Sequence, residues 1–320
     1  MPKPLKTSKK PRVVIALGGN ALQKNGEVSA EAQRAVANEV GKIVASLSSK
    51  YEIVLAHGNG PQVGNILIHE EQASSDKAPA MPLETAVAMS QGQIGYWLAQ
   101  SIDNAFTKSG KSKKVATVVT QVEVDRRDPA FKNPTKPVGQ FYSEKEAKQL
   151  AREKGWVVKE DSGRGWRRVV PSPKPKSIVE SKEILSLVKS GVLVIAAGGG
   201  GVPVYRTRVL KLLKGVDAVI DKDFAAEKLA ELIKADLFLS VTAVDFAYLN
   251  FGQPNETALK TLTAKEAEYY SRQGFFKAGS MLPKITAATE FAKSGKTGII
   301  CSLNNLQSAL KLESGTIIRG

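Results

Sequence analysis

The stretch RVVIALGGN, residues 12–20, decides the fold of this chain. Residues 13–17 of this stretch form an unbroken apolar run, partly β-branched, and a pair of glycines follows it. A short apolar run that stops at glycine is typical of a buried strand followed by a tight turn. Further runs of this kind lie at residues 51–57, 114–120 and 192–197, and the first and last of these also end in glycines.

Segments with helical periodicity separate these strands, at residues 29–47, 61–73, 82–108 and 177–190. Helices that alternate with strands indicate an α/β fold with a largely parallel sheet. After Gly215, where we expect a domain boundary, the same rhythm continues. Helices are predicted at 224–234, 264–273 and 282–294, and strands at 237–242, 244–251, 297–302 and 315–319. Asp223 is the expected N-cap of the first of these helices.

The alternation of strands and helices is interrupted at residues 121–176. Prolines gather at 128–129, 133–137 and 171–175, around a single short helical pattern at 143–154. A segment of about 50 residues is too long to be a plain connection within a compact domain. We therefore expect it to form a lid or a binding subdomain.

The composition excludes several classes of protein. Of 320 residues, 42% are hydrophobic and 24% charged, as in ordinary soluble globular proteins. The apolar runs are far shorter than the roughly 20 residues of a membrane helix. Cys301 is the single cysteine, and His57 and His69 are the two histidines. An internal disulfide and a His/Cys zinc site are therefore not expected.

Residues 1–11 are basic and no apolar segment follows them. We expect a disordered tail rather than a signal peptide, and a cytoplasmic protein. The formal net charge is +15, and most of it lies at 1–12, 107–122 and 162–179. Such clusters can bind nucleic acid or small polyanions, or simply form solvated faces. The solvated face is favoured for the first two clusters.

Glycine-rich turns follow three of the predicted strands, at 18–20, 58–60 and 198–201. In open α/β sheets ligands bind at the carboxyl ends of the strands, and glycine lets backbone N–H groups approach an anion closely. Neither the P-loop pattern nor the G-x-G-x-x-G pattern is present, which disfavours a P-loop enzyme and nicotinamide binding. We expect a different kind of anion site.

Two lysines lie at the starts of predicted helices. Lys222 stands between Asp221 and Asp223, and Lys284 follows the loop that contains Gly279. A lysine in the first turn opposes the helix dipole, which is unfavourable unless an anion is bound there. The alternative interpretation is a capped helix with solvated charges.

Eight segments together resemble the carbamate kinases of the amino-acid kinase family. They are ALGGNA at 16–21, HGNGPQVG at 57–64, AMSQG at 88–92, NPTKPVG at 133–139, GRGW at 163–166, VVPSPKP at 169–175, VDAVIDKD at 216–223 and AGSMLPK at 278–284. The first two point only to the wider family. The segments of the expected lid separate the carbamate kinases from acetylglutamate, aspartate and uridylate kinases. Two departures are Ser162, where a small alanine is expected, and the basic extension before residue 12.

The resemblance implies a three-layer αβα sandwich with a mainly parallel central sheet, two lobes and a protruding lid, paired as a homodimer. Residues 12–214 would form the carbamate lobe, with the lid inserted at about 121–176. Residues 215–320 would form the nucleotide-binding lobe. The implied reaction is ADP + carbamoyl phosphate ⇌ ATP + carbamate, the ATP-forming step of arginine fermentation. Mg²⁺ would arrive with the nucleotide, without a metal site of the protein's own.

The resemblance also implies roles for individual residues. The catalytic set would be Lys136, Lys222, Lys284 and Asp223, with Asp223 fixing the last two lysines. Carbamoyl phosphate would contact Gly18, Gly19, Asn20, Gly58, Asn59, Gly60 and Arg164. The nucleotide would contact Lys222, Lys284, Asp221, Thr242, Val244, Tyr248 and Met281.

Two alternatives stay open, and the second belongs to a different class of function. The first is another amino-acid kinase that acts on a longer acid or a nucleotide, although the long lid argues against it. The second is a nucleic-acid-binding protein on the same fold. The charge clusters permit that, but no RNA-binding aromatic motif is present. We expect neither a nucleic acid nor a membrane as partner.

Overall fold

The computed structural model describes residues 10–19, 22, 27, 29–161 and 163–320. Most of the expected tail, Asn20 and Ser162 lie outside the described residues. The centre of the molecule is an eight-stranded sheet in the order β15-β17-β16-β12-β1-β2-β9-β3. Its strands are β1 (Arg12–Leu17), β2 (Glu52–His57), β3 (Val115–Thr117), β9 (Leu193–Ile195), β12 (Leu237–Thr242), β15 (Thr261–Thr263), β16 (Thr297–Ser302) and β17 (Thr316–Arg319).

The pairing in this sheet is parallel except between β16 and β17. The crossover connections of parallel strands carry the helices, as the alternating sequence pattern predicts. These helices are α1 (Ala30–Leu47), α3 (Leu83–Lys108), α5 (Ser181–Lys189), α6 (Lys222–Leu232), α7 (Ala264–Arg272), α8 (Met281–Lys293) and α9 (Leu306–Leu310).

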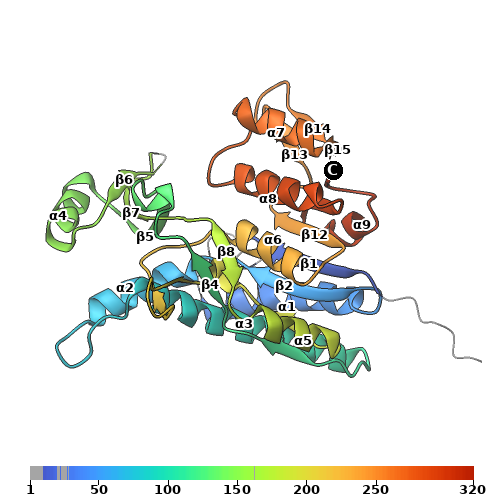
Figure 1. The fold of residues 1–320 in the computed structure, drawn as a ribbon, viewed down its shortest axis with the longest axis horizontal. Coiled ribbons are helices and arrows are strands. Elements are labelled where there is room, and N and C mark those ends of the chain that lie inside the picture. Colours follow the sequence, from blue (N-terminus) through green and yellow to red (C-terminus); the bar gives the residue numbers. More distant parts are fainter. Residues whose placement is uncertain (1–9, 20–21, 23–26, 28, 162) are drawn as a thin grey trace, which may run out of the picture.

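The helices cover both faces of the sheet (Figure 1). Along β1, Val13, Ile15 and Leu17 pack with residues of α1, α3 and α9. The alternate residues Val14 and Ala16 pack with residues of α5, α6 and α8. Successive side chains of a strand point to opposite faces, so this central strand is buried on both sides. The expected three-layer αβα sandwich is confirmed.

Two sheets of more than two strands lie beside the sandwich. The first is the four-stranded sheet β11-β10-β4-β8, and the second is the three-stranded sheet β5-β7-β6. Figure 1 shows β5, β6 and β7 with helix α4 standing out to one side of the main body. The strands are β4 (Gln121–Val124), β5 (Lys136–Tyr142), β6 (Val158–Glu160), β7 (Trp166–Val170), β8 (Pro175–Ile178), β10 (Val202–Arg206) and β11 (Leu213–Gly215). Helix α4 spans Glu144–Lys154, and a 3-10 turn spans Pro129–Phe131.

The segment expected as a lid therefore divides into two parts. Its ends, β4 and β8, pair with each other and, through β10, belong to the four-stranded sheet. The three-stranded sheet β5-β7-β6, which we call the outstanding sheet because it stands out from the main body, occupies only the middle of the expected lid, residues 136–170. The division of the whole chain into two lobes at residue 214 stays a prediction.

Two expectations about local structure were wrong. Helix α6 begins at Lys222, two residues earlier than predicted, because the N-cap is Asp221 and not Asp223: the Asp221 carboxylate accepts from the Asp223 backbone N–H. The expected strand at 244–251 is reduced to β13 (Ala247–Leu249), which pairs with β14 (Thr257–Leu259) outside the main sheet. Asn250 has a positive φ of 52°, a conformation that ends the strand directly after Leu249.

Helix α2 (Gln62–Ala73) follows the second glycine turn and precedes α3. Among the described residues, no helix is both long and apolar enough to cross a membrane.

Candidate active site

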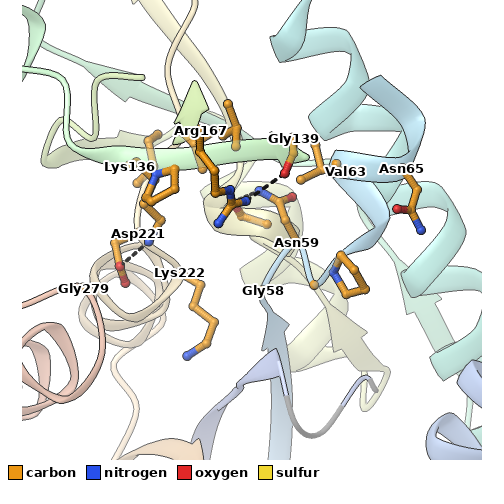
Figure 2. A pocket seen from close by; sticks show the side chains of 18 of the residues that line it. Gly58, Asn59, Val63, Asn65, Lys136, Gly139, Arg167, Asp221, Lys222 and Gly279 are labelled. Atoms are coloured by element: carbon orange, nitrogen blue, oxygen red, sulfur yellow. Dashed lines mark hydrogen bonds and ion pairs between the residues drawn. The ribbon is translucent and has the colours of Figure 1, made fainter. Parts of the chain in front are cut away.

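A cavity of about 540 Å³ lies where β2 ends and the helices α6 and α8 begin. The strand β5 of the outstanding sheet closes it from another side. Its charged lining consists of four cations and two carboxylates, namely Lys136, Arg167, Lys222, Lys284, Asp221 and Asp223. Figure 2 shows the cavity with most of these side chains turned inward. An excess of positive charge in a concave site favours an anionic ligand.

Asp223 holds two of the lysines. Its Oδ1 lies 2.7 Å from Lys222 Nζ, and its Oδ2 lies 2.9 Å from Lys284 Nζ. The Ser240 hydroxyl, at the middle of β12, donates to Oδ1 at 2.6 Å. Asp223 is buried, and a buried carboxylate needs such partners to stay ionised. The contacts place two ammonium groups at fixed positions on one wall of the cavity.

The pKa values of this cluster move in opposite directions. Burial lowers the pKa of Lys222 to about 8, and the Asp223 carboxylate only partly offsets it. Burial would also lower the pKa of Lys284, but Asp223 outweighs it and the pKa is raised. Burial would raise the pKa of Asp223, yet the two ammonium groups keep that pKa below its usual value. Lys222 is thus the lysine whose charge depends on pH near neutrality.

Lys136 reaches the same cavity from the outstanding sheet. Its Nζ lies 2.8 Å from Asp221 Oδ2, 85 residues away in the sequence. The other oxygen of Asp221 accepts from the Asp223 backbone N–H at 3.0 Å, which caps helix α6. Figure 2 shows Lys136 turned toward Asp221, above Lys222. One carboxylate thus joins the outstanding sheet to the start of α6.

The glycine turns at 58–60 and 198–201 form the opposite wall. Asn59 Nδ2 donates to the Gly199 carbonyl at 3.2 Å, and Asn59 Oδ1 accepts from the Ser90 hydroxyl at 2.9 Å. Gly199 has a φ of +65°, and a Cβ there would lie 1.9 Å from Asn59 Oδ1. Glycine is required on both grounds, since a side chain would displace Asn59. Gly58 and Gly60 of the first turn also line the cavity.

His57 packs behind this wall and holds the Gly58 backbone in place. It is buried, and its Nδ1 lies 2.8 Å from the Gly58 carbonyl oxygen. Burial lowers the pKa of His57 to about 4, so the ring is neutral near pH 7. A neutral ring donates from Nδ1 to the Gly58 carbonyl. His57 therefore acts as a packed support, not as a charge in the cavity.

The structure brings together only part of the predicted site. Lys136, Lys222, Lys284, Asp221, Asp223, Gly58, Asn59 and Gly60 all line the cavity. Gly18 and Gly19 do not line it. A Cβ on Gly18 would lie 2.6 Å from the Val241 carbonyl oxygen, so this glycine permits the close packing of β1 against β12. Asn20 lies outside the described residues.

The residues predicted to hold the nucleotide base are distributed around the start of α8 and the strand β13. Thr242 is the last residue of β12, Val244 lies two residues further along the chain, and Met281 is the first residue of α8. Tyr248 lies on β13, with ring centroids 6.3 Å from Phe246 and 5.8 Å from Phe251. None of the four predicted residues lines the cavity, so their part in nucleotide binding stays a prediction.

Arg167, not Arg164, is the arginine that lines the cavity. The Arg164 side chain is 63% exposed and pairs with Asp161 at 3.1 Å. The Arg167 guanidinium donates to the Gly139 carbonyl at 2.9 Å and extends toward Asn59 (Figure 2). Its Nε is buried without a hydrogen-bond partner among the described residues. The Nη1 of the same guanidinium pairs with Asp161 Oδ2 at 3.1 Å, so Arg167 is held by two partners, Gly139 on β5 and Asp161 directly after β6.

The sequence contains a partial signal for this residue. Arg167 and Arg168 are neighbours on β7, so strand alternation puts them on opposite faces and only one can face the cavity. Arg168 instead pairs with Asp217 at 2.7 Å and lies over the Trp156 ring at 5.0 Å. Which of the two faces inward depends on the pairing of β7, which the sequence does not specify.

Comparisons with known proteins identify the family of the chain. The model of the amino acid kinase family matches residues 11–302. The carbamate kinase of Pyrococcus horikoshii is 53% identical over 312 residues, which cover 95% of this chain and 98% of that protein. Carbamate kinase 1 of Enterococcus faecium is 50% identical over 299 residues, covering 93% and 95%.

A solved structure shows the same likeness in three dimensions. The carbamate kinase of Giardia lamblia bound to AMP-PNP superposes with a TM-score of 0.90 at 43% identity, covering 97% of this chain and 98% of that one. The α/β fold and the lysine-rich cavity define a phosphotransferase of the amino acid kinase type. The chain belongs to the amino acid kinase family, and within it to the carbamate kinases.

Proposed function

We propose that this protein transfers a phosphoryl group reversibly between carbamoyl phosphate and ADP, forming ATP and carbamate. The observation that carries the proposal is the convergence of Lys136, Lys222 and Lys284 on one cavity. Both reactants are anions, and phosphoryl transfer asks a protein mainly for positioning and neutralisation of charge. Three ammonium groups and one guanidinium against two carboxylates supply that neutralisation.

In the ATP-forming direction, a terminal β-phosphate oxygen of ADP attacks the phosphorus of carbamoyl phosphate. The bond from phosphorus to the carbamate oxygen breaks, and carbamate leaves with that electron pair. Lys222 and Lys284 would hold the phosphates of the nucleotide and the transferred group. Asp223 would keep both ammonium groups aimed at the group in transfer. The fixed 2.7 and 2.9 Å contacts support this role, since preorganised charges stabilise a transition state most.

The wall formed by Gly58, Asn59 and Gly60 would hold carbamoyl phosphate, with Arg167 opposite. Arg167 lines the cavity, and a guanidinium suits the phosphate oxygens of that substrate. Lys136 would leave Asp221 for the transferring phosphoryl group and shield it from water with the rest of the outstanding sheet. Thr242, Val244, Tyr248 and Met281 would contact the nucleotide base.

Mg²⁺ would enter as part of the nucleotide substrate and neutralise phosphate oxygens there. Both oxygens of Asp223 are engaged by lysines, which leaves this carboxylate no free oxygen for a metal ion. Among the described residues, no group of three or more His, Cys, Asp or Glu is placed to hold a metal ion. We further propose a cytoplasmic homodimer that forms ATP from arginine-derived carbamoyl phosphate.

A direct assay tests the proposal. Pure protein is mixed with ADP, Mg²⁺ and carbamoyl phosphate, and ATP is followed by a coupled reaction. We expect ATP formation that requires all three. Parallel assays offer ATP with acetylglutamate or with uridine monophosphate. Phosphorylation of either of these, without ATP formation from carbamoyl phosphate, would assign the chain to a different kinase of the family.

A further inference from the structure

The hairpin between β10 and β11 carries an exposed apolar tip. Val209, Leu210 and Leu212 are 86%, 72% and 55% exposed, the densest group of exposed aliphatic side chains on the described surface. Single exposed aliphatic residues are normal, but three within four positions are not. None of the three lines the cavity of the candidate active site.

The tip is held in a defined shape. The Thr207 backbone N–H donates to the Leu212 carbonyl at 2.9 Å, and the Leu212 N–H donates to the Thr207 hydroxyl at 3.0 Å. The Arg206 guanidinium donates to the Lys211 carbonyl at 3.1 Å. The turn is therefore closed by its own hydrogen bonds, and its apolar side chains are presented outward by an ordered backbone.

A basic groove of about 860 Å³ adjoins the tip and shares no lining residue with the active-site cavity. Its acids are already paired. Glu123 lies 3.1 Å from Arg206 Nε, and Asp125 lies 2.8 Å from Arg127 Nη2. Its cations are Arg126, Arg127, Lys176, Arg206, Arg208 and Lys211.

Three of these cations, Arg126, Arg208 and Lys211, have no carboxylate partner within the described part of the chain. Arg126 instead lies over the Tyr205 ring at 4.7 Å. Arg208 and Lys211 flank the exposed Val209 and Leu210 directly in the sequence. Unneutralised charge thus surrounds the apolar tip.

We propose that the hairpin tip and the basic groove bind the surface of an anionic lipid bilayer. The aliphatic side chains would enter the boundary between headgroups and acyl chains, while the cations meet the lipid phosphates and carboxylates. This combination is the one that peripheral membrane attachment requires. It is surface binding and involves no membrane-spanning segment. The proposal is independent of the reaction at the active site.

A nucleic acid or a second copy of this chain would match the hairpin tip and the basic groove less well than an anionic bilayer. A nucleic-acid backbone would use the cations but leave the apolar tip exposed to water. A second copy would bring the same patch to a symmetric interface, and a basic patch repels itself. An anionic bilayer satisfies both the charged and the apolar parts.

Flotation of the full chain with vesicles tests the proposal. We expect binding to vesicles of phosphatidylcholine with phosphatidylserine and not to phosphatidylcholine alone. Arg208→Glu with Lys211→Glu should weaken binding about tenfold or more. Leu210→Ser should weaken it by a similar factor, because the transfer of its side chain into the bilayer is lost. Circular dichroism melting checks that each variant is folded.

Matched controls make the result specific. Lys182→Glu with Lys189→Glu on α5 changes the net charge equally, and Leu232→Ser removes an exposed leucine elsewhere; both should bind as the unaltered protein does. A chain lacking residues 2–9 should also bind. Unchanged binding by Leu210→Ser would reduce the effect to ionic adsorption and overturn the proposal. So would loss of binding on deletion of the tail, or a change of oligomeric state by Leu210→Ser, seen by sedimentation velocity, without loss of vesicle binding.

Discussion

Lys222 is the residue on which the proposed chemistry depends most directly. Its side chain is only 11% exposed and is held by Asp223, so it is not the solvated charge that the alternative interpretation of the sequence described. Lys222→Ala should lower kcat by about a hundredfold or more, which corresponds to roughly 3 kcal/mol of transition-state stabilisation. Lys222→Met keeps the aliphatic stem and should show the same loss, which separates charge from packing. Turnover near normal in the Met variant would remove Lys222 from the mechanism.

The pH dependence of the reaction follows from the same residue. The pKa of Lys222 is lowered to about 8 in the free protein, so its ammonium form is present below that pH and lost above it. We expect kcat/KM to fall above about pH 8 with the loss of one proton, since this parameter reports the free enzyme. The fall in kcat should come at higher pH, because bound phosphates raise the pKa of the lysine.

Lys222→Arg is the variant that checks this assignment, since a guanidinium stays charged throughout the range. Whatever activity it retains should lack the fall near pH 8. An unchanged alkaline limb in steady-state rates would assign the titration to another group.

At the scale of the element, Asp221 connects the stability of α6 to the position of Lys136. One of its oxygens caps the helix and the other pairs with Lys136. Asp221→Ala should lower the free energy of unfolding by about 1–2 kcal/mol, of which a lost cap contributes about 1 kcal/mol. Asp221→Asn keeps a capping oxygen and should cost less. Urea unfolding of both variants gives the comparison, and equal losses would show that the cap contributes nothing.

At the scale of the whole molecule, Lys136 links the outstanding sheet to the main body. Lys136→Ala should lower kcat by roughly a hundredfold if the ammonium group meets the transferring phosphoryl group. The affinity for ADP, measured by calorimetry, should be nearly unchanged, because Lys222 and Lys284 remain in place. Lys159→Ala, an exposed lysine on β6 of the same sheet, is the matched control and should be silent. A normal kcat for Lys136→Ala would make the outstanding sheet a structural arm.

Much of the molecule followed from local sequence patterns. The alternation of apolar runs with helical periodicity predicted the α/β class, because strand and helix periods of 2 and 3.6 are local properties. The glycine turn at 58–60 and the lysines at the starts of α6 and α8 were predicted for a similar reason. Each of these features depends only on the residues of one turn and of the helix that follows it.

The errors in the prediction have a common physical cause. Asp221 and Asp223 have the same capping chemistry, and only the entry of the chain into α6 selects one of them. Arg164 and Arg167 lie three residues apart, and only the pairing of β7 with β5 and β6 turns Arg167 into the cavity. Residues 244–251 are apolar enough for the main sheet, yet the turn after Leu249 directs them into a separate hairpin.

The sequence by itself therefore determined the class of fold, the elements and the kinds of side chain at the site. These depend on interactions between residues that are close along the chain. The tertiary structure alone decided which charges meet. Asp221 and Lys136 are 85 residues apart, and Asp223 and Lys284 are 61 apart, yet each pair lies within 3 Å. Contacts of that kind depend on how sheets and helices pack against one another. Local sequence patterns do not determine that packing, because it involves residues far apart in the chain.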